Sequence, residues 1–188
     1  MQTLYFVTRN EGKVKEVEEI LGILVHPFRA DLEEIQSLDL EEIVRAKVQR
    51  AFELVGKPLF LDDVALHFEA WNGFPGPFIK YLCEAVGNEG LLKMMKDETN
   101  RHTTAKAAIG FHNGKEVIIF TGEVQGTIAK EPRGEGGWGW DPIFVPAHTD
   151  KTYAELTPEE KNVVSHRRAA LENFKKYLGV LNCSREVV

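Results

Sequence analysis

The sequence is poor in cysteine, has no long apolar run and has no excess of positive charge. Only two of its 188 residues are cysteine, Cys83 and Cys183, and they form no CxxC pair. Neither a disulfide framework nor a zinc site is therefore indicated, and we expect two reduced thiols. No run reaches the roughly 18 apolar residues of a membrane span. The start, Met1-Gln2-Thr3, has no basic targeting segment, so we expect a cytosolic protein that does not bind membranes.

Acidic residues outnumber basic ones, 29 to 23, which gives a formal net charge of −6. This balance argues against a protein that binds nucleic acid or an anionic membrane through its overall field. Basic stripes interleaved with aromatic residues are also missing, so nucleic acid is not an expected partner. Any phosphate site must be local. The length suffices for a sizeable core in one domain, or in two lobes that share a sheet.

Hydrophobic periodicity predicts a protein in which helices alternate with strands and a hairpin follows. The predicted strands are residues 3–8, 25–29, 58–61, 103–112 and 116–125, with another short strand after Pro142. The first predicted helix has Val14, Val17, Leu21 and Leu24 on one face, and the second covers residues 39–55 and is closed by Gly56. A third helix starts at Pro77 and directs Ile79, Leu82, Cys83 and Val86 inward. Further helical segments start at Thr157 and run from Ser165 to Leu178. This order predicts an α/β fold with a mixed sheet and helices packed on it.

Two local signals support this assignment. Asn113-Gly114 separates two strand-like runs, and Asn-Gly is the preferred pair for a type I′ hairpin turn. Thr157 followed by Glu160 fits a capping box, with Pro158 at the first helical position.

A polar loop from Thr8 to Lys13 lies between a predicted strand and a predicted helix. Backbone N–H groups at the helix start, together with the Lys13 ammonium, would suit a phosphate. The loop is not a Walker A motif. The alternative is an ordinary strand-to-helix turn.

Three carboxylates form a second candidate site. Asp62 and Asp63 follow directly on a buried strand, where two acids are costly unless they reach solvent or bind a cation. Glu34 lies in another acidic segment. Mg²⁺ is normally held by one or two such carboxylates with waters and substrate phosphates. The alternative is a solvated loop.

The third cluster combines aromatic and basic residues: Trp138-Gly139-Trp140-Asp141, Lys161 and Ser165-His166-Arg167. An aromatic wall beside such donors could sandwich a nucleobase and read its edge. Core packing explains the tryptophans as well, and a helix cap with surface charges explains the Ser-His-Arg segment. Spacing alone assigns no reaction.

Six ordered motifs together resemble the inosine triphosphate pyrophosphatase, or Ham1-like, family. The motifs are Thr8-x-Asn10-x-x-Lys13 with Glu16, Asp31-Leu32-x-Glu34-Ile35-Gln36, Asp62-Asp63, Asn72-Gly73-Phe74-Pro75-Gly76-Pro77, Gly139-Trp140-Asp141-Pro142, and Lys161-Asn162-x-x-Ser165-His166-Arg167. The motifs cover nearly the whole chain. We therefore expect residues 1–188 to form one domain with two lobes. The resemblance implies an elongated α/β fold with two lobes and a central cleft. It also implies a homodimer that hydrolyses ITP, dITP and XTP to the monophosphate and pyrophosphate with Mg²⁺, for which Mn²⁺ could substitute.

The resemblance also implies a role for each matching residue. The triphosphate would contact Thr8, Asn10, Lys13, Lys47 and Lys80. The metal ligands would be Glu34, Asp63 and Asp62, with Asp63 also orienting the attacking water as the catalytic base. The purine would contact Trp138, Gly139, Trp140, Asp141, Lys161, His166 and Arg167. Cationic donors favour the 6-keto group of inosine and xanthosine over the 6-amino group of adenine, because a buried donor left unpaired costs roughly 1–3 kcal/mol.

The sequence departs from the family pattern at two places. Val64-Ala65 replaces a Ser/Thr-Gly pair after the acids, and Arg9 stands where a small residue is usual. Two alternative functions remain open. One is a pyrophosphatase for modified pyrimidine or methylated nucleotides, as in Maf-like relatives of this fold. The other is a nucleotide-binding module that has lost hydrolysis.

Overall fold

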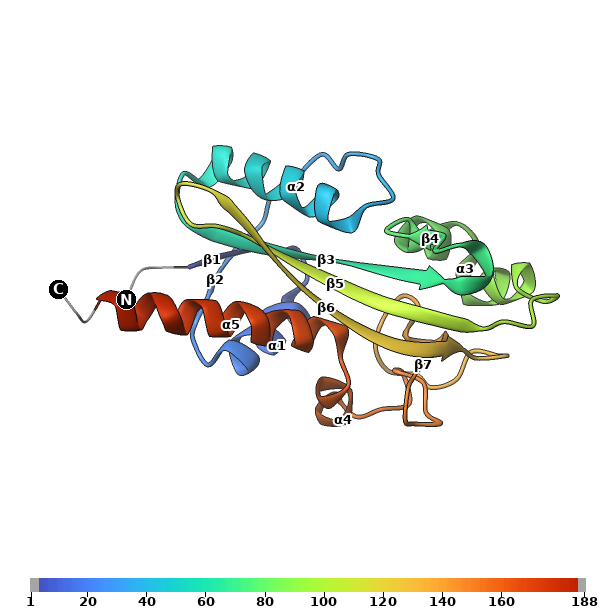
Figure 1. Ribbon diagram of the computed structural model, residues 1–188. Coiled ribbons are helices and arrows are strands. Elements are labelled where there is room, and N and C mark those ends of the chain that lie inside the picture. The colour runs from blue at the N-terminus through green and yellow to red at the C-terminus, as the bar shows by residue number, and fades with distance from the viewer. Residues whose placement is uncertain (1–3, 186–188) are drawn as a thin grey trace. The chain divides into compact units, whose positions relative to one another are not determined.

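The computed structural model describes residues 4–185, and their side chains through residue 179 (Figure 1). The strands are β1 (Tyr5–Val7), β2 (His26–Phe28), β3 (Leu59–Phe68), β4 (Pro75–Gly76), β5 (His102–His112), β6 (Val117–Ile128) and β7 (Phe144–Pro146). The α-helices are α1 (Glu11–Leu21), α2 (Leu40–Val55), α3 (Ile79–Met94), α4 (Pro158–Val163) and α5 (His166–Arg185). Short 3₁₀ turns cover Glu69–Trp71 and Asp141–Ile143.

The strands form one mixed sheet of seven strands in the order β2-β1-β3-β5-β6-β7, with β4 beside β3. β1 pairs in parallel with both β2 and β3, whereas the β3–β4 and β6–β7 pairs are antiparallel. The predicted α/β class with a mixed sheet flanked by helices is therefore confirmed. Within residues 4–185, no helix combines the length and apolar composition that a membrane span needs.

The chain divides into two compact units. Unit 1 comprises Met1–Asp63, Ala107–Gly122 and Arg167–Val188, and unit 2 comprises Val64–Lys106 and Glu123–His166. Strands β3, β5 and β6 each contribute residues to both units. The cleft that the family resemblance implies stays a prediction.

In unit 1, α2 covers one face of the sheet, while α1 and α5 cover the other (Figure 1). Phe174 of α5 is the centre of the α5 face, with ring centroids 5.2 Å from Phe60, 5.1 Å from Phe111 and 5.2 Å from Phe120. Phe60 in turn stacks on Phe6 of β1 at 4.6 Å. Rings from three strands thus contact one helix, and a fourth strand joins them through Phe60, which anchors α5 to the sheet.

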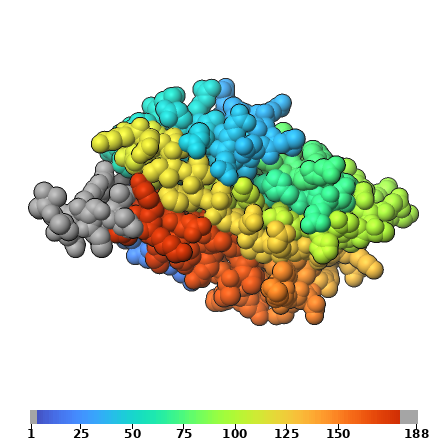
Figure 2. Space-filling view, in the orientation of Figure 1, coloured from blue at the N-terminus to red at the C-terminus, as the bar shows by residue number. Residues whose placement is uncertain are grey.

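The opposite face of unit 1 depends on a close approach between α2 and β5. Val44 and Val48 of α2 are fully buried, and a Cβ built on Gly110 of β5 would lie only 2.3 Å from Val48. Figure 2 shows α2 at the surface beside the β5–β6 hairpin, where the Arg45 guanidinium donates to the Val117 carbonyl at 3.1 Å. Glycine at 110 therefore makes room for the helix.

Unit 2 has its own apolar core, which gathers residues from the sheet, from α3 and from the segment after β6. Trp140, Phe144 and Tyr153 pack against one another in this core, with the Phe144 and Tyr153 centroids 4.7 Å apart. Tyr153 is 1% exposed although it carries a hydroxyl, because that hydroxyl donates to the Val164 carbonyl at 2.8 Å. The core thereby fixes the loop that precedes α5.

Several predicted boundaries are wrong in instructive ways. α1 ends at Leu21 because Gly22 takes a left-handed conformation (φ 70°), so Leu24 lies beyond the helix and is 83% exposed. The third strand does not end at Leu61 but runs through both acids to Phe68. α3 begins at Ile79 rather than at Pro77, and its helical geometry is broken at Gly87.

The predicted hairpin is present, but its turn is not type I′. That turn needs positive φ at both central residues, and only Gly114 of the pair has it (φ 100°). Asn113 instead accepts hydrogen bonds at its side-chain oxygen from the Lys115 and Glu116 N–H groups. Cys83 is a free thiol as expected, and Cys183 lies outside the described side chains.

Gly110→Ala should destabilise the protein by about 1–3 kcal/mol, because the added methyl group would overpack α2 against β5. Urea denaturation would measure the change in the free energy of unfolding. Gly179→Ala is the matched control, since among the described residues no atom outside its chain neighbours and the adjacent helix backbone lies within 4 Å of a Cβ built there. Equal stability of the two variants would contradict this account of the α2 face.

Candidate active site

The predicted phosphate loop is the start of α1 in unit 1. Asn10 caps this helix, since its side-chain oxygen accepts from the Gly12 N–H at 2.9 Å and more weakly from the Lys13 N–H at 3.4 Å. The Thr8 hydroxyl accepts from the Asn10 N–H at 3.1 Å. These bonds hold the loop so that the Lys13 side chain is directed at β3.

Asp62 of β3 binds two cations from two helices. Both carboxylate oxygens accept from the Lys13 ammonium at 3.0 Å, and one also accepts from Arg167 Nε at 2.8 Å. Arg167, at the start of α5, reaches Glu16 of α1 through Nη1 at 2.9 Å. Burial would raise the pKa of Asp62, but Lys13 and Arg167 outweigh it and hold that pKa far below its usual value. Burial would lower the pKa of Arg167, but Asp62 and Glu16 outweigh this effect and raise that pKa.

Asp63, the next residue, is bound to a different helix. The Lys47 ammonium of α2 donates to Asp63 at 2.6 Å and to Glu34 at 2.7 Å, so one ammonium holds two carboxylates together. Burial raises the pKa of Asp63, although Lys47 and Lys13 oppose this shift. Burial would lower the pKa of Lys47, but Asp63 and Glu34 outweigh it and raise that pKa.

The alternation of side chains along a strand explains why these neighbouring acids have different partners. Successive residues of a strand point to opposite faces of the sheet. Asp62 shares the face of Phe60, on which α1 and α5 pack, and Asp63 shares the other face with α2. The two acids of the sequence motif therefore lie on opposite faces of the sheet in unit 1, and the predicted role of both as metal ligands stays a prediction.

Unit 2 brings together most of the residues predicted to contact a base. The Lys161 ammonium forms an ion pair with buried Asp141 at 2.6 Å and lies 4.8 Å from the Trp138 ring centroid. Asp141 also accepts from the Trp138 N–H at 2.8 Å. Trp138 is 44% exposed as a residue, so it lies at the surface, where a ligand could reach it. Lys161 thus bridges an acid and an aromatic ring.

Buried aromatic rings surround His166. Its ring stacks on Tyr153, with centroids 5.9 Å apart and planes 13° apart, and lies 5.4 Å from Trp140. Trp140 is 7% exposed and belongs to the core of unit 2. The two tryptophans of the motif therefore differ, because Trp140 packs inside the unit and Trp138 lies at its surface.

The remaining predicted residues occupy simpler surroundings. Gly139 has a positive φ of 62° and leads the chain from Trp138 into Trp140. Lys80 is exposed on α3, with its ammonium 5.5 Å from the Tyr81 ring. Of the departures from the family pattern, Arg9 pairs with exposed Asp31 at 3.1 Å, and Val64 packs against the core of unit 2.

The donor set of Glu34 and Asp63 fits a magnesium ion. Across the described part of the chain, no three His, Cys, Asp or Glu side chains gather closely enough to bind a metal by themselves. Magnesium does not need such a cage, because one or two carboxylates with waters and substrate phosphates suffice. Glu34 and Asp63 each accept from the Lys47 ammonium at one oxygen, whereas both oxygens of Asp62 accept from Lys13 and one of them also from Arg167.

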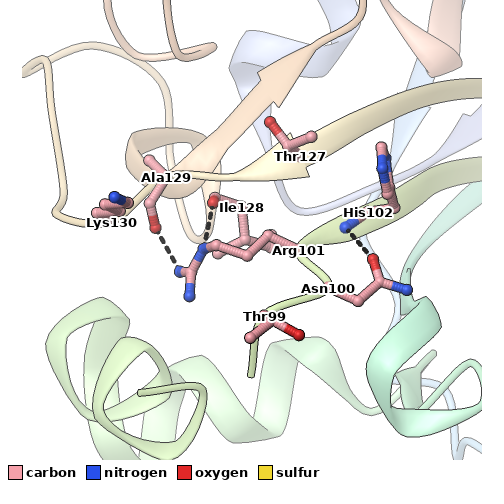
Figure 3. A pocket seen from close by; sticks show the side chains of 8 residues that line it. All are labelled: Thr99, Asn100, Arg101, His102, Thr127, Ile128, Ala129 and Lys130. Atoms are coloured by element: carbon pink, nitrogen blue, oxygen red, sulfur yellow. Dashed lines mark hydrogen bonds between the residues drawn. The ribbon is translucent and has the colours of Figure 1, made fainter. Parts of the chain in front are cut away.

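A separate hollow of about 590 Å³ in unit 2 contains none of the predicted site residues (Figure 3). Arg101 lies across it and donates to the backbone carbonyls of Ile128 at 2.7 Å, Ala129 at 2.6 Å and Met95 at 3.3 Å. A cation is favourable at the carbonyl end of a helix, and Met95 is the C-cap residue that directly follows α3. Arg101 therefore ties the end of α3 to the end of β6.

The sequence analysis missed Tyr153 and gave Glu16 no role. Tyr153 contacts both His166 and Lys161, the latter at 5.1 Å from its ring centroid. No local pattern singles out Tyr153, because its partners lie in the later segment that folds back on it. Glu16 was visible only as part of a motif, since its partner Arg167 is distant in sequence.

Asp62→Asn should cost about 3–5 kcal/mol of stability, because it removes one of the two carboxylates that neutralise buried Arg167 and also the carboxylate that pairs with Lys13. Since the pKa of Asp62 is lowered on folding, its contribution is present above the unfolded value of about 3.9 and is lost as the pH falls below it. The stability gap between wild type and variant should therefore narrow in acid. Urea titrations at several pH values would measure this gap.

Asp31→Asn is the control for that experiment, because the Asp31 side chain is 91% exposed in its pair with Arg9. Exposed ion pairs contribute about 0–1 kcal/mol. A similar small loss for Asp62→Asn would show that Asp62 is not the anchor described above.

Comparison with known proteins shows the family of the chain. Residues 4–177 match the model of the Ham1 family. The chain is 45% identical to a dITP/XTP pyrophosphatase of Thermococcus kodakarensis over 93% of this chain and 96% of that protein. It is 42% identical to an inosine triphosphate pyrophosphatase of Emericella nidulans over 95% and 97%.

Solved structures give the same result for the fold. The structure of a HAM1 protein from Coxiella burnetii superimposes with a TM-score of 0.85 at 31% identity, covering 95% of this chain and 99% of that one. The Staphylococcus aureus Ham1 protein gives a TM-score of 0.82 at 29% identity, covering 94% and 98%. The chain therefore belongs to the Ham1 family.

Proposed function

We propose that the protein is a Mg²⁺-dependent pyrophosphatase that hydrolyses ITP, dITP and XTP to the monophosphate and pyrophosphate. The observation that carries the proposal is the contact of Glu34 and Asp63 with one ammonium, that of Lys47. Two carboxylates so placed, beside lysines, suit a metal-bound polyphosphate. The names of the relatives from Thermococcus kodakarensis and Emericella nidulans support the same reaction.

The triphosphate would be bound by groups that unit 1 already holds in place. Lys13 and Lys47 supply two positive charges, and each is fixed by carboxylates in the absence of substrate. Asn10 and Thr8 would add polar contacts at the start of α1. Lys80 of unit 2 is exposed and is proposed as a further cationic contact.

Glu34 and Asp63 would hold the magnesium ion, and Mn²⁺ is a suitable substitute. Bound there, the metal supplies Lewis-acid neutralisation of charge on the phosphoryl oxygens. Asp63 would orient and deprotonate the attacking water, a role that requires a carboxylate within hydrogen-bond reach of that water. Asp62, whose oxygens are used by Lys13 and Arg167, would support the site by fixing these two cations.

Base selection is proposed to lie in unit 2, on the Trp138 ring with Lys161 and His166 as donors. A 6-keto purine offers such donors an acceptor, and a 6-amino purine leaves them unpaired at a cost of roughly 1–3 kcal/mol. The resemblance also assigned Arg167 to the base. That role stays a prediction, because its Nε and Nη1 donate to Asp62 and Glu16. The implied homodimer and cytosolic location also stay predictions.

A substrate panel tests the reaction and its selectivity. The protein would be incubated with Mg²⁺ and ITP, dITP, XTP, GTP, ATP or dTTP, and the products separated by chromatography. We expect monophosphate and pyrophosphate from the first three only, with loss of activity in a chelator and recovery on adding Mg²⁺. Preferential hydrolysis of dTTP would favour a Maf-like activity, and tight binding without any product would favour a binding module.

Glu34→Gln and Asp63→Asn should each lower kcat/KM by at least about a hundredfold, because they remove a metal ligand and, for Asp63, the base. Circular dichroism should show an unchanged fold. Glu33→Gln is the matched control, since the Glu33 side chain is 88% exposed and pairs only loosely with Arg50, at 3.8 Å. An Asp63→Asn enzyme that keeps full metal-dependent activity would remove Asp63 from the mechanism.

A further inference from the structure

Helix α3 contains a break that the proposed reaction does not explain. Gly87 has φ 67° and ψ 179°, which is outside helical geometry and favours glycine. Three residues later, a Cβ built on Gly90 would lie 2.6 Å from the Val86 Cβ. Two glycines thus allow the chain to turn sharply within one helix, and the turn places Asn88 at the start of its second half.

Asn88 makes a specific contact with the loop that carries Trp138. Its Nδ2 donates to the Gly139 carbonyl at 2.9 Å. The opposite amide orientation would place two acceptor oxygens against each other, so the chemistry of the pair fixes which end faces the loop. The other end, Oδ1, is buried and has no hydrogen-bond partner among the described residues.

A buried acceptor without a partner is unfavourable, so this side chain is not explained by stability alone. Leaving such an atom unpaired costs roughly as much as one hydrogen bond contributes. An apolar side chain of the same size would avoid that cost and lose only the bond to Gly139. Asparagine at position 88 instead provides one hydrogen bond, from Nδ2 to the Gly139 carbonyl.

Besides the contact with Asn88, the loop at Gly139 is held by hydrogen bonds between Trp138 and Asp141. The Trp138 N–H donates to the Asp141 carboxylate at 2.8 Å, and the Asp141 N–H donates to the Trp138 carbonyl at 3.2 Å. Gly137 fits there only because it lacks a side chain, since its Cβ would lie 2.1 Å from an Asp141 oxygen. The contact from α3 is therefore a second, independent support for the backbone next to Trp138.

We propose that Asn88 is a positioning residue that sets how the Trp138 ring is presented to the purine of the substrate. The inference rests on the proposed function in its assignment of Trp138 to the base. Asn88 does not touch the substrate. It acts through the Gly139 carbonyl, and its effect is on substrate binding rather than on the chemical step.

The first test reads Trp138 directly and needs no substrate. The protein would be labelled with 5-fluorotryptophan, which gives one ¹⁹F resonance each for Trp71, Trp138 and Trp140. The resonance that disappears in Trp138→Phe is that of Trp138. Asn88→Leu should shift or broaden the Trp138 resonance alone. Asn88→Asp should displace it further, because it places a negatively charged oxygen against the Gly139 carbonyl oxygen. The control Glu89→Leu, at the exposed neighbouring position, should leave all three unchanged.

The second test separates binding from catalysis. Asn88→Leu should raise KM for ITP by about three- to tenfold, the range that one lost hydrogen bond gives, and should leave kcat within about twofold. Its thermal midpoint should stay that of the wild type, because the unpaired oxygen is lost together with the bond. Glu89→Leu should match the wild type in KM.

The outcomes are distinct. An unchanged Trp138 resonance in Asn88→Leu and Asn88→Asp, or a wild-type KM, would overturn the proposal. Movement of all three resonances with a lowered thermal midpoint would also overturn it, because Asn88 would then be a general structural residue. If the wild type hydrolyses no purine triphosphate, the proposed function fails, and the positioning of Trp138 is then decided by the fluorine resonances alone.

Discussion

The fold of unit 1 depends on how two consecutive carboxylates on β3 are neutralised. Because side chains alternate along a strand, Asp62 faces α1 and α5 and Asp63 faces α2. Each acid would be costly in the sheet without a cation. Three helices therefore deliver Lys13, Arg167 and Lys47 to the same short stretch of strand. The three helices have to pack where their cations reach the two acids, so the same contacts fix both the helices and the charged groups.

This constraint also explains how an acidic protein can bind a polyanion. The net charge of −6 gives no general attraction to phosphate, so positive charge has to be concentrated locally. Lys13 and Lys47 are fixed by carboxylates before any ligand arrives, which reduces the entropy that binding would cost. The contact of Glu34 and Asp63 with one ammonium keeps two like charges close together. A site preorganised in this way suits a divalent cation and its phosphates.

Much of the fold was predictable because it depends on local patterns. Apolar periodicity, the Gly56 cap and the capping box at Thr157 predicted the helices, and strand-like runs predicted the hairpin. The errors arise where tertiary context decides. Asn113 binds its own turn instead of taking a positive φ, and β3 continues through its acids because cations from distant helices neutralise them. Tyr153 and Asn88 act through contacts between distant segments, which no local motif reveals.

The most direct test of the account is the identity of the bond that is broken. Phosphorus-31 NMR would follow ITP during incubation with the wild-type protein and Mg²⁺. Attack directed by Asp63 at the α-phosphorus predicts that IMP and pyrophosphate form in equal amounts, so that the pyrophosphate resonance, which holds two phosphorus atoms, grows at twice the rate of the IMP resonance, with no IDP at any time. Appearance of IDP with inorganic phosphate would place cleavage at the terminal phosphate and would contradict the proposed function.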